Sequence, residues 1–181
     1  MTPFVALLRG INVGKAKRVA MGDLRELLAS LGYEDVRTLL NSGNAVFRAP
    51  ARSPSAHAKR IRSTMAATLG VDAPVIVVPA AEFSSIAAAN PLRAIASDPS
   101  RLLVAFVDDT YALASLRDLA TASWAPEALA VGRHAAYLWC PGGILASRVA
   151  EAVAGRLGER VTTRNDATVG KLDALLRSLG D

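Results

Sequence analysis

A glycine-bounded segment near the N-terminus combines cations with a conformationally free backbone. The segment Gly10–Arg18 reads GINVGKAKR and lies between a short apolar run and the first helical pattern. Backbone N–H groups at a helix start carry partial positive charge, so this loop, with Lys15, Lys17 and Arg18, suits a phosphate or carboxylate. It is not a Walker A loop, because its glycines are one residue too close and Ala16 stands where Ser or Thr would bind magnesium. A tight turn with solvated cations fits the same residues.

Few other residues have types and spacing suited to catalysis or metal binding. His57, His134 and Cys140 are too few and wrongly spaced for a zinc site. A Ser-His-Asp arrangement could draw on His134 with Asp108 or Asp109, but no nucleophile motif accompanies it. The two aspartates fit a helix N-cap as well as a site for a hard cation. We therefore assign no catalytic residue and expect no metal and no cofactor.

Positive charge is concentrated in the N-terminal half. Residues 1–90 contain 11 basic and 6 acidic side chains, whereas residues 91–181 contain 10 of each, which gives the net charge of +5. No carboxylate occurs between Asp35 and Asp72. This asymmetry indicates an anionic partner, a phosphate-bearing small molecule or nucleic acid, although a solvated basic face fits as well. The aromatic content of 5% disfavours a single-strand stacking surface.

The composition narrows the class of protein. A chain of 181 residues with 51% hydrophobic and 20% charged residues is expected to fold, as one large domain or two small ones. The longest apolar runs fall far short of the ~20 residues that span a bilayer, so we expect no membrane partner. The N-terminus shows no export signal and the lone Cys140 cannot form an internal disulfide. These features predict a cytoplasmic protein.

The first half of the chain has the element order βαββαβ. Apolar runs and alternation predict strands, helical spacing predicts helices, and Asn41–Asn44 has the residue types of a hairpin turn. The strands are expected over Phe4–Leu8, Val36–Leu40, Ala45–Arg48 and Pro74–Pro79, and the helices over Met21–Leu31 and Ser55–Leu69.

The second half repeats this order after a short helix at Glu82–Ala89 and a loop to Ser100. Strands are expected over Leu102–Val107, Glu127–Val131, Ala135–Cys140 and Arg160–Thr163, and helices over Tyr111–Ala120, Ser147–Leu157 and Val169–Leu179. We predict an α+β fold of two ferredoxin-like split βαβ units, formed by duplication, with a C-terminal helix. The predicted boundaries are 1–80, a linker at 81–100, a second unit at 101–164 and the helix at 165–181.

The predicted topology brings two loops together. In a split βαβ unit, the third strand lies antiparallel between the first and second. The loop after strand one and the hairpin between strands two and three therefore share one end of the sheet. We expect Arg9 and Asn12 to lie near Ser42 and Asn44. If the site binds an anion, Arg9 should be partly buried there.

Several short motifs resemble a bacterial family called domain of unknown function 1697. They are Leu7–Gly14 (LLRGINVG), Asp35–Thr38 (DVRT), Ser42–Phe47 (SGNAVF), Ala89–Pro91 (ANP), Thr163–Asn165 (TRN), Thr168–Val169 and Lys171–Leu172. The resemblance spans nearly the whole chain and implies a fold of two ferredoxin-like halves, without an established activity. The chain departs from the family at Gly14–Lys17, where Gly-Gly-Lys-Asn is common, and at Asp166, where an aromatic residue is common.

The resemblance also implies a set of shared polar positions. These positions are Arg9, Asn12, Ser42, Asn44, Asn90, Arg164, Asn165 and Lys171. We take all of them except Asn90, together with Lys15, as candidate ligand-binding residues. Structural roles are open for these residues: turn geometry for Asn12 and Asn44, a pair with Asp166 or a neighbouring carboxylate for Arg164, a helix cap for Asn165, and a solvated position for Lys171.

Three functional hypotheses follow. The first is an anion-binding module in which the candidate residues meet a phosphate-bearing ligand, a nucleotide or a nucleic-acid backbone. The second is a small-molecule enzyme with a pocket between the halves, in which Arg9 or Arg164 holds an anionic group and Asp166 acts as the base. The third is an interaction protein that forms homo-oligomers through exposed sheet edges.

Overall fold

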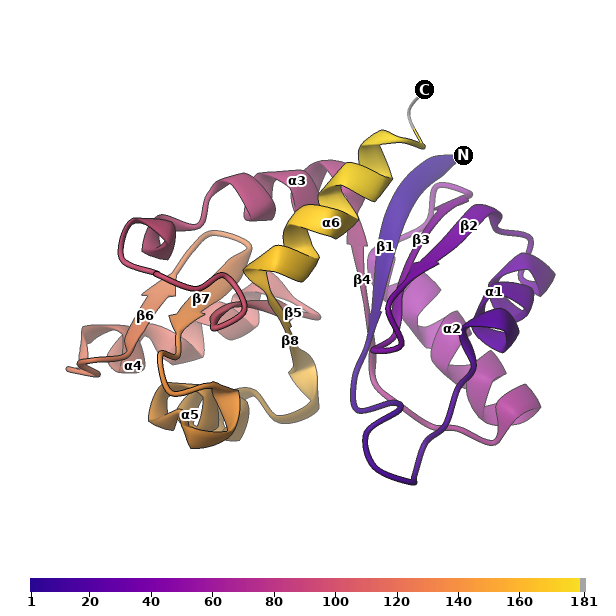
Figure 1. Ribbon diagram of the computed structural model, residues 1–181. Helices are drawn as coiled ribbons and strands as arrows, with labels where there is room; N and C mark the ends of the chain where they lie inside the picture. Colours follow the sequence, from indigo (N-terminus) through magenta and orange to yellow (C-terminus); the bar gives the residue numbers. More distant parts are fainter. Residues whose placement is uncertain (180–181) are drawn as a thin grey trace. The chain divides into compact units, whose positions relative to one another are not determined.

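The computed structural model describes residues 1–179, which form two four-stranded sheets (Figure 1). Sheet A has the strand order β2-β3-β1-β4 and sheet B the order β6-β7-β5-β8, and every neighbouring pair is antiparallel. The strands are β1 (Thr2–Leu8), β2 (Glu34–Leu39), β3 (Asn44–Ala49), β4 (Val75–Pro79), β5 (Leu102–Val107), β6 (Ala128–Val131), β7 (Ala135–Trp139) and β8 (Val161–Asn165). The predicted α+β class and the repeated strand order are confirmed.

The chain divides into two compact units. Unit 1 comprises Met1–Phe83 and the chain from Leu172 on, and unit 2 comprises Ser84–Lys171. The chain passes from one unit to the other within helix α3 and again within helix α6. The α-helices are α1 (Met21–Ser30), α2 (Pro54–Leu69), α3 (Ala80–Ala88), α4 (Arg117–Thr121), α5 (Arg148–Leu157) and α6 (Asp166–Arg177). No helix in the described residues is long and apolar enough to cross a membrane.

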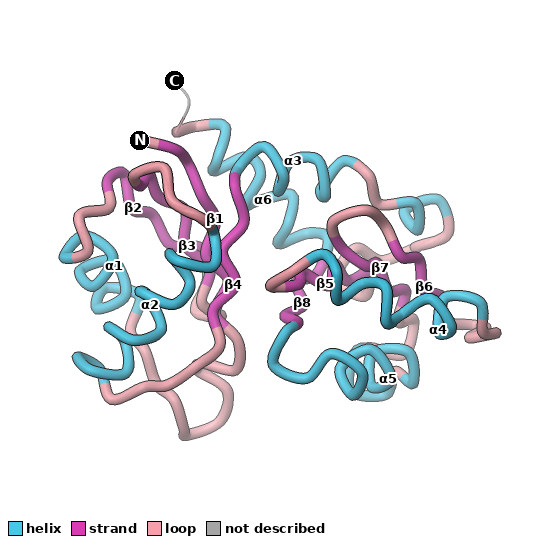
Figure 2. Tube along the Cα trace, turned by 180° about the vertical axis from the view of Figure 1, so that it is seen from behind, coloured by secondary structure: helices cyan, strands magenta, loops and turns pink. Residues whose placement is uncertain are grey.

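The core of unit 1 lies between sheet A and helices α1 and α2, which cover one face of the sheet (Figure 2). Alternate residues of β1 point into this core, and Leu24, Ile61 and Met65 from the helices complete it. Helix α1 ends before Gly32, which adopts a φ of +78°, as the predicted stop requires. Helix α2 begins with a Ser53 cap and ends at Gly70.

Unit 2 has its own core between sheet B and the segments that follow β5 and β7. Strands β5 and β7 are buried along their whole length, and Val149 and Val153 of α5 pack against them. The predicted helix at Tyr111–Ala120 is wrong in type, because Thr110–Leu116 is the 3₁₀ helix η2 and only Arg117–Thr121 is α-helical. The Asp109 carboxylate accepts a hydrogen bond from the Tyr111 N–H at 3.0 Å and starts the tighter helix.

The segment after α3 is also more ordered than the predicted loop. Pro91–Ala94 forms a 3₁₀ turn, η1, whose N-cap is Asn90. The last helix begins three residues before the predicted Val169, because the Asn165 side chain caps it. Two further 3₁₀ turns, η3 (Ile144–Ala146) and η4 (Gly158–Arg160), flank α5.

Candidate functional site

The loop after β1 and the hairpin between β2 and β3 meet at one end of sheet A. The Leu8 N–H donates to the Gly43 carbonyl at 2.8 Å, and the Arg9 N–H donates to the Pro74 carbonyl at 2.9 Å. The Asn12 amide reaches the Asn41 carbonyl at 2.7 Å. The meeting of these two segments, which strand order alone predicts, is therefore confirmed.

Asn12 fixes the shape of this loop. Its Nδ2 donates to the Val19 carbonyl at 2.8 Å, and its Oδ1 accepts from the Val19 N–H at 2.9 Å. Its own backbone N–H donates to the Lys17 carbonyl at 3.0 Å, and its φ is +57°. Asn12 thus has the structural role that left-handed turn geometry implies, because its side chain closes the loop on itself.

We use the name cationic loop for residues 13–18, the segment that Asn12 closes by its hydrogen bonds. Lys15, Lys17 and Arg18 are exposed, and the loop contains no acidic residue. Arg62 donates two hydrogen bonds to Asp72 and holds the pKa of that carboxyl below its usual value, with a smaller contribution from the charge of Lys17. Within residues 1–179, the side chains of Lys15 and Arg18 form no ion pair or hydrogen bond.

The candidate residues of the hairpin are not equivalent. Asn44 is fully buried in β3, and its Nδ2 donates to the Leu39 carbonyl and to Ser42 Oγ, both at 2.9 Å. Ser42 is exposed. Positive φ occurs at Leu40 and Gly43 rather than at Asn44, so the buried amide supports the turn by hydrogen bonding.

Three candidate residues belong to unit 2, and two of them, Arg164 and Asn165, make structural hydrogen bonds there. Arg164 is 9% exposed in β8, and its Nη1 donates to Thr162 Oγ1 at 2.9 Å and to the Thr163 carbonyl at 2.8 Å. Burial lowers the pKa of its guanidinium to about 10. The Asn165 Oδ1 accepts from the Thr168 N–H at 2.8 Å and caps α6, whereas Lys171 is exposed on that helix.

Asp166 belongs to a cluster that we call the polar clamp, made of Asn90, Arg93 and Asp166. Arg93 donates to both carboxylate oxygens of Asp166, at 2.9 and 2.8 Å, and Asn90 Nδ2 donates to one of them at 3.2 Å. The expected pair between Arg164 and Asp166 does not form, because Arg93 occupies the carboxylate. The clamp ties η1 to the start of α6, which favours a structural role for Asp166 over that of a base.

We expect Asp166→Ala to lower the free energy of unfolding by about 2 kcal/mol. The substitution leaves the buried Asn90 amide without an acceptor and removes the partner of Arg93. Urea denaturation followed by circular dichroism measures this loss. Asp118→Ala is the control, since it breaks a solvent-exposed pair with Arg156, and such pairs contribute little to stability. Equal losses in the two variants would contradict a structural role for the clamp.

Two clusters were not found by sequence reasoning. A buried His57 contacts Tyr33 in the core of unit 1, and Arg117 and Arg133 lie along a groove in unit 2. Neither set shows a motif or a regular spacing in the sequence. Each cluster joins a residue of a helix to a residue of a loop, His57 to Tyr33 and Arg117 to Arg133, which only the folded chain brings together.

Two split βαβ units with the same strand order define an α+β protein with two ferredoxin-like sheets. The chain belongs to the family described as protein of unknown function DUF1697, whose model matches residues 1–137. It is also similar in structure to the conserved bacterial protein SP0830 from Streptococcus pneumoniae, with a TM-score of 0.74 and 21% identity over 97% of this chain and 98% of that one. Comparison with curated proteins gives no match. At this identity, the structural likeness establishes the fold alone.

Proposed function

We propose that the cationic loop of unit 1, with the half-buried Arg9 at its base, binds a phosphate-bearing anion. The observation that carries the proposal is a loop fixed by Asn12 that presents exposed cations, two of which, Lys15 and Arg18, have no ion-pair partner within residues 1–179. A loop already held in one shape loses little conformational entropy when it binds a ligand.

The backbone of the loop supports the same proposal. Gly10, Asn12 and Gly14 all have positive φ, with one residue between each pair, a backbone pattern found in anion-binding turns. The Asn12 N–H already donates to the Lys17 carbonyl, so the N–H groups of the neighbouring residues are the ones that would face an anion. Helix α1 follows, and its N-cap Ala20 offers no side-chain acceptor to the first N–H groups. The helix start therefore adds partial positive charge next to Lys15 and Arg18.

The ligand class that fits these features is a small phosphate or the phosphate of a nucleic-acid backbone. Both ligands would contact the same cations, so separate titrations with pyrophosphate and with duplex DNA are needed to distinguish them. The enzyme hypothesis gains no support from Asp166, whose oxygens accept hydrogen bonds from Arg93 and Asn90.

We expect pyrophosphate to raise the melting temperature of the full chain at low ionic strength. A ligand that binds only the folded state at a hundredfold excess over its Kd stabilises that state by ~2.7 kcal/mol. The double variant Lys15→Ala/Arg18→Ala should lose most of this stabilisation. The control Arg52→Ala/Lys59→Ala removes the same amount of charge from two exposed positions, one before α2 and one within it. This control should retain the stabilisation by pyrophosphate. Equal losses would mean that the effect is one of net charge.

Two further comparisons define the site. Arg9→Ala should abolish stabilisation by pyrophosphate while lowering the stability of the ligand-free protein little. A large loss of stability without ligand would show that Arg9 is structural.

A titration with duplex DNA distinguishes the two ligand classes. DNA should not bind if the natural partner is a small phosphate and should bind if it is a nucleic-acid backbone. Its log affinity would then fall with log salt at a slope of ~0.9 per phosphate contacted. No response to pyrophosphate or DNA would reject the proposal.

A further inference from the structure

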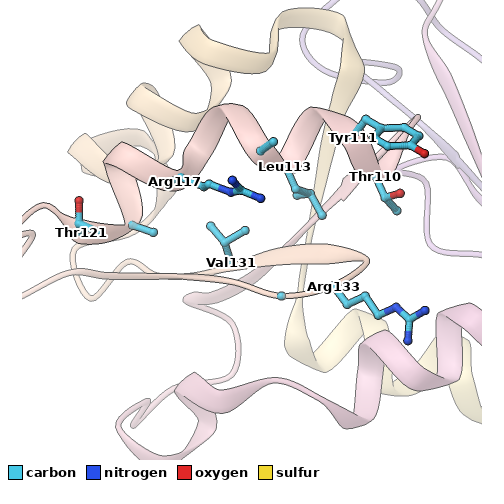
Figure 3. Close-up of a pocket in the computed structure, with 10 residues that line it drawn as sticks. Thr110, Tyr111, Leu113, Arg117, Thr121, Val131 and Arg133 are labelled. Atoms are coloured by element: carbon cyan, nitrogen blue, oxygen red, sulfur yellow. The ribbon is translucent and has the colours of Figure 1, made fainter.

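Unit 2 has a groove between its helical segment after β5 and the tip of the β6–β7 hairpin. Its volume is about 560 Å³, with Thr110–Thr121 on one side and Val131–Arg133 on the other. Figure 3 shows Arg117 extending from the helical side toward the hairpin, whereas Arg133 extends from the hairpin tip away from Arg117. Small-molecule sites in proteins have volumes of about 300–1,000 Å³, so the groove has the size of such a site.

The two arginines of the groove differ from the other arginines of unit 2. Five of those form ion pairs with carboxylates, and Arg164 donates hydrogen bonds to Thr162 and Thr163. Among the residues that the structure describes, the side chains of Arg117 and Arg133 have neither an ion pair nor a hydrogen bond. The two arginines of unit 2 that lack such a partner thus both line the same groove.

The acidic side chains in and beside the helical segment of the groove do not neutralise these charges. Asp118 pairs with Arg156 at 2.8 Å, and Asp108 pairs with Arg160 at 3.1 Å. Asp109 accepts the hydrogen bond that starts η2. The described residues that line the groove include no carboxylate, so the groove is positively charged and favours an anion. Guanidinium groups match the geometry of phosphate oxygens.

The rest of the groove is suited to a planar apolar group. Leu113 is buried and Val131 half-buried, and both line the groove. The Tyr111 ring is 86% exposed at one end, next to Thr110 (Figure 3). A tyrosine ring exposed to this degree offers a face on which a nucleobase stacks.

We propose that this groove binds a nucleoside monophosphate. Its phosphate is held by Arg117 and by the exposed Arg133, whose side chain turns back from its orientation in Figure 3 to reach the groove. Its base lies on the ring of Tyr111 and the apolar side chains of Leu113 and Val131. The combination of two cations without partners, an exposed aromatic ring and an apolar floor distinguishes this ligand from a bare anion. The site lies in unit 2 and is independent of the anion site proposed for unit 1.

Calorimetric titration of the full chain with adenosine 5′-monophosphate tests this proposal. Arg117→Ala and Arg133→Ala should each weaken binding by about tenfold, the loss expected when a charge-assisted hydrogen bond is removed. Tyr111→Ala should weaken binding by about tenfold through lost stacking, whereas Tyr111→Phe keeps the ring and should bind normally. Adenosine and inorganic phosphate, titrated separately, should each bind at least about tenfold more weakly than the nucleotide.

Arg148→Ala is the matched control, because it removes one exposed cation of unit 2 that does not line the groove. Unchanged affinity in Arg117→Ala and Arg133→Ala, or no binding by the wild type, would overturn the proposal. Phosphate that binds as tightly as the nucleotide, with no effect of Tyr111→Ala, would overturn the ligand class. A loss confined to Lys15→Ala/Arg18→Ala would place the nucleotide in unit 1, rejecting the groove and leaving the unit 1 proposal intact.

Discussion

Replacing Gly43 by alanine is expected to destabilise the protein by about 3 kcal/mol. Gly43 has a φ of +83°, and a Cβ there would lie 2.7 Å from Leu8 Cβ and 2.9 Å from Ile11 Cδ1. Left-handed backbone costs a non-glycine residue ~1–2 kcal/mol, and overpacking a core adds ~1–3 kcal/mol. Both costs apply at once, because the hairpin turn packs directly on the end of β1. Urea denaturation measures the loss.

Gly14 provides the matched control for this substitution. Its φ is +63°, but no atom lies within 4 Å of the position of an added Cβ. Gly14→Ala should therefore show only the backbone cost of ~1–2 kcal/mol. If both alanine variants lost the same stability, close packing of the hairpin against Leu8 and Ile11 would not contribute. The difference between the two variants isolates the contribution of packing.

The fold could be predicted because its signals are local. Phe4–Leu8 is an apolar run with glycine after it, and Ser55–Leu69 has helical spacing that ends at Gly70. Each such segment has one way to bury its apolar side chains, and the order of the segments then fixes the split βαβ topology. The helix predicted at Tyr111–Ala120 was wrong in type, because buried side chains at Ala112, Leu113 and Leu116 fit a 3₁₀ helix as well as an α-helix.

The roles of the candidate residues were harder to predict, because they depend on partners far away in the chain. Asn12 and Asn44 were chosen as candidates because they are polar residues at the end of the sheet where the two loops meet. In the structure, both side-chain amides donate hydrogen bonds to backbone carbonyls of the loop and hairpin. Arg93 binds the carboxylate of Asp166, which lies 73 positions further along the chain. No local sequence pattern indicates such a pair. The sequence therefore predicts the element on which each residue lies but not the residue that it contacts.

His57 shows the same limit in the core of unit 1. The ring is fully buried among Phe4, Tyr33 and Phe47, with centroid distances of 4.8, 5.3 and 6.3 Å. Its Nδ1 lies 2.8 Å from the Tyr33 hydroxyl, and its Nε2 lies 3.1 Å from the Pro50 carbonyl. A carbonyl only accepts, so Nε2 carries a proton and Nδ1 accepts from the tyrosine. Both nitrogens are satisfied by a neutral imidazole.

We expect the free energy of unfolding to fall as the pH drops below about 6.5, the pKa of an unperturbed histidine. Burial lowers the pKa of His57, and the charges of Arg52 and Arg60 lower it further, although the hydrogen bond to Pro50 opposes this. The unfolded chain therefore binds a proton at a pH where the folded chain does not. Stability is complete above the unfolded pKa and declines as the pH falls toward the folded one. Each lowering of the folded-state pKa by one unit below the unfolded-state pKa adds about 1.4 kcal/mol to the free energy of unfolding at high pH.

Urea denaturation between pH 8 and pH 5, above the range in which most carboxylates titrate, tests this expectation. His57→Gln should be less stable at pH 8 by about 2–3 kcal/mol, through lost packing and hydrogen bonds, but its stability should no longer decline over this interval. Tyr33→Phe separates the two effects, because it removes the hydrogen bond to Nδ1 and keeps both the stacked ring and the buried histidine. It should cost about 1 kcal/mol at pH 8 and retain a decline on acidification. A wild-type decline that persisted unchanged in His57→Gln would assign the pH dependence to another group.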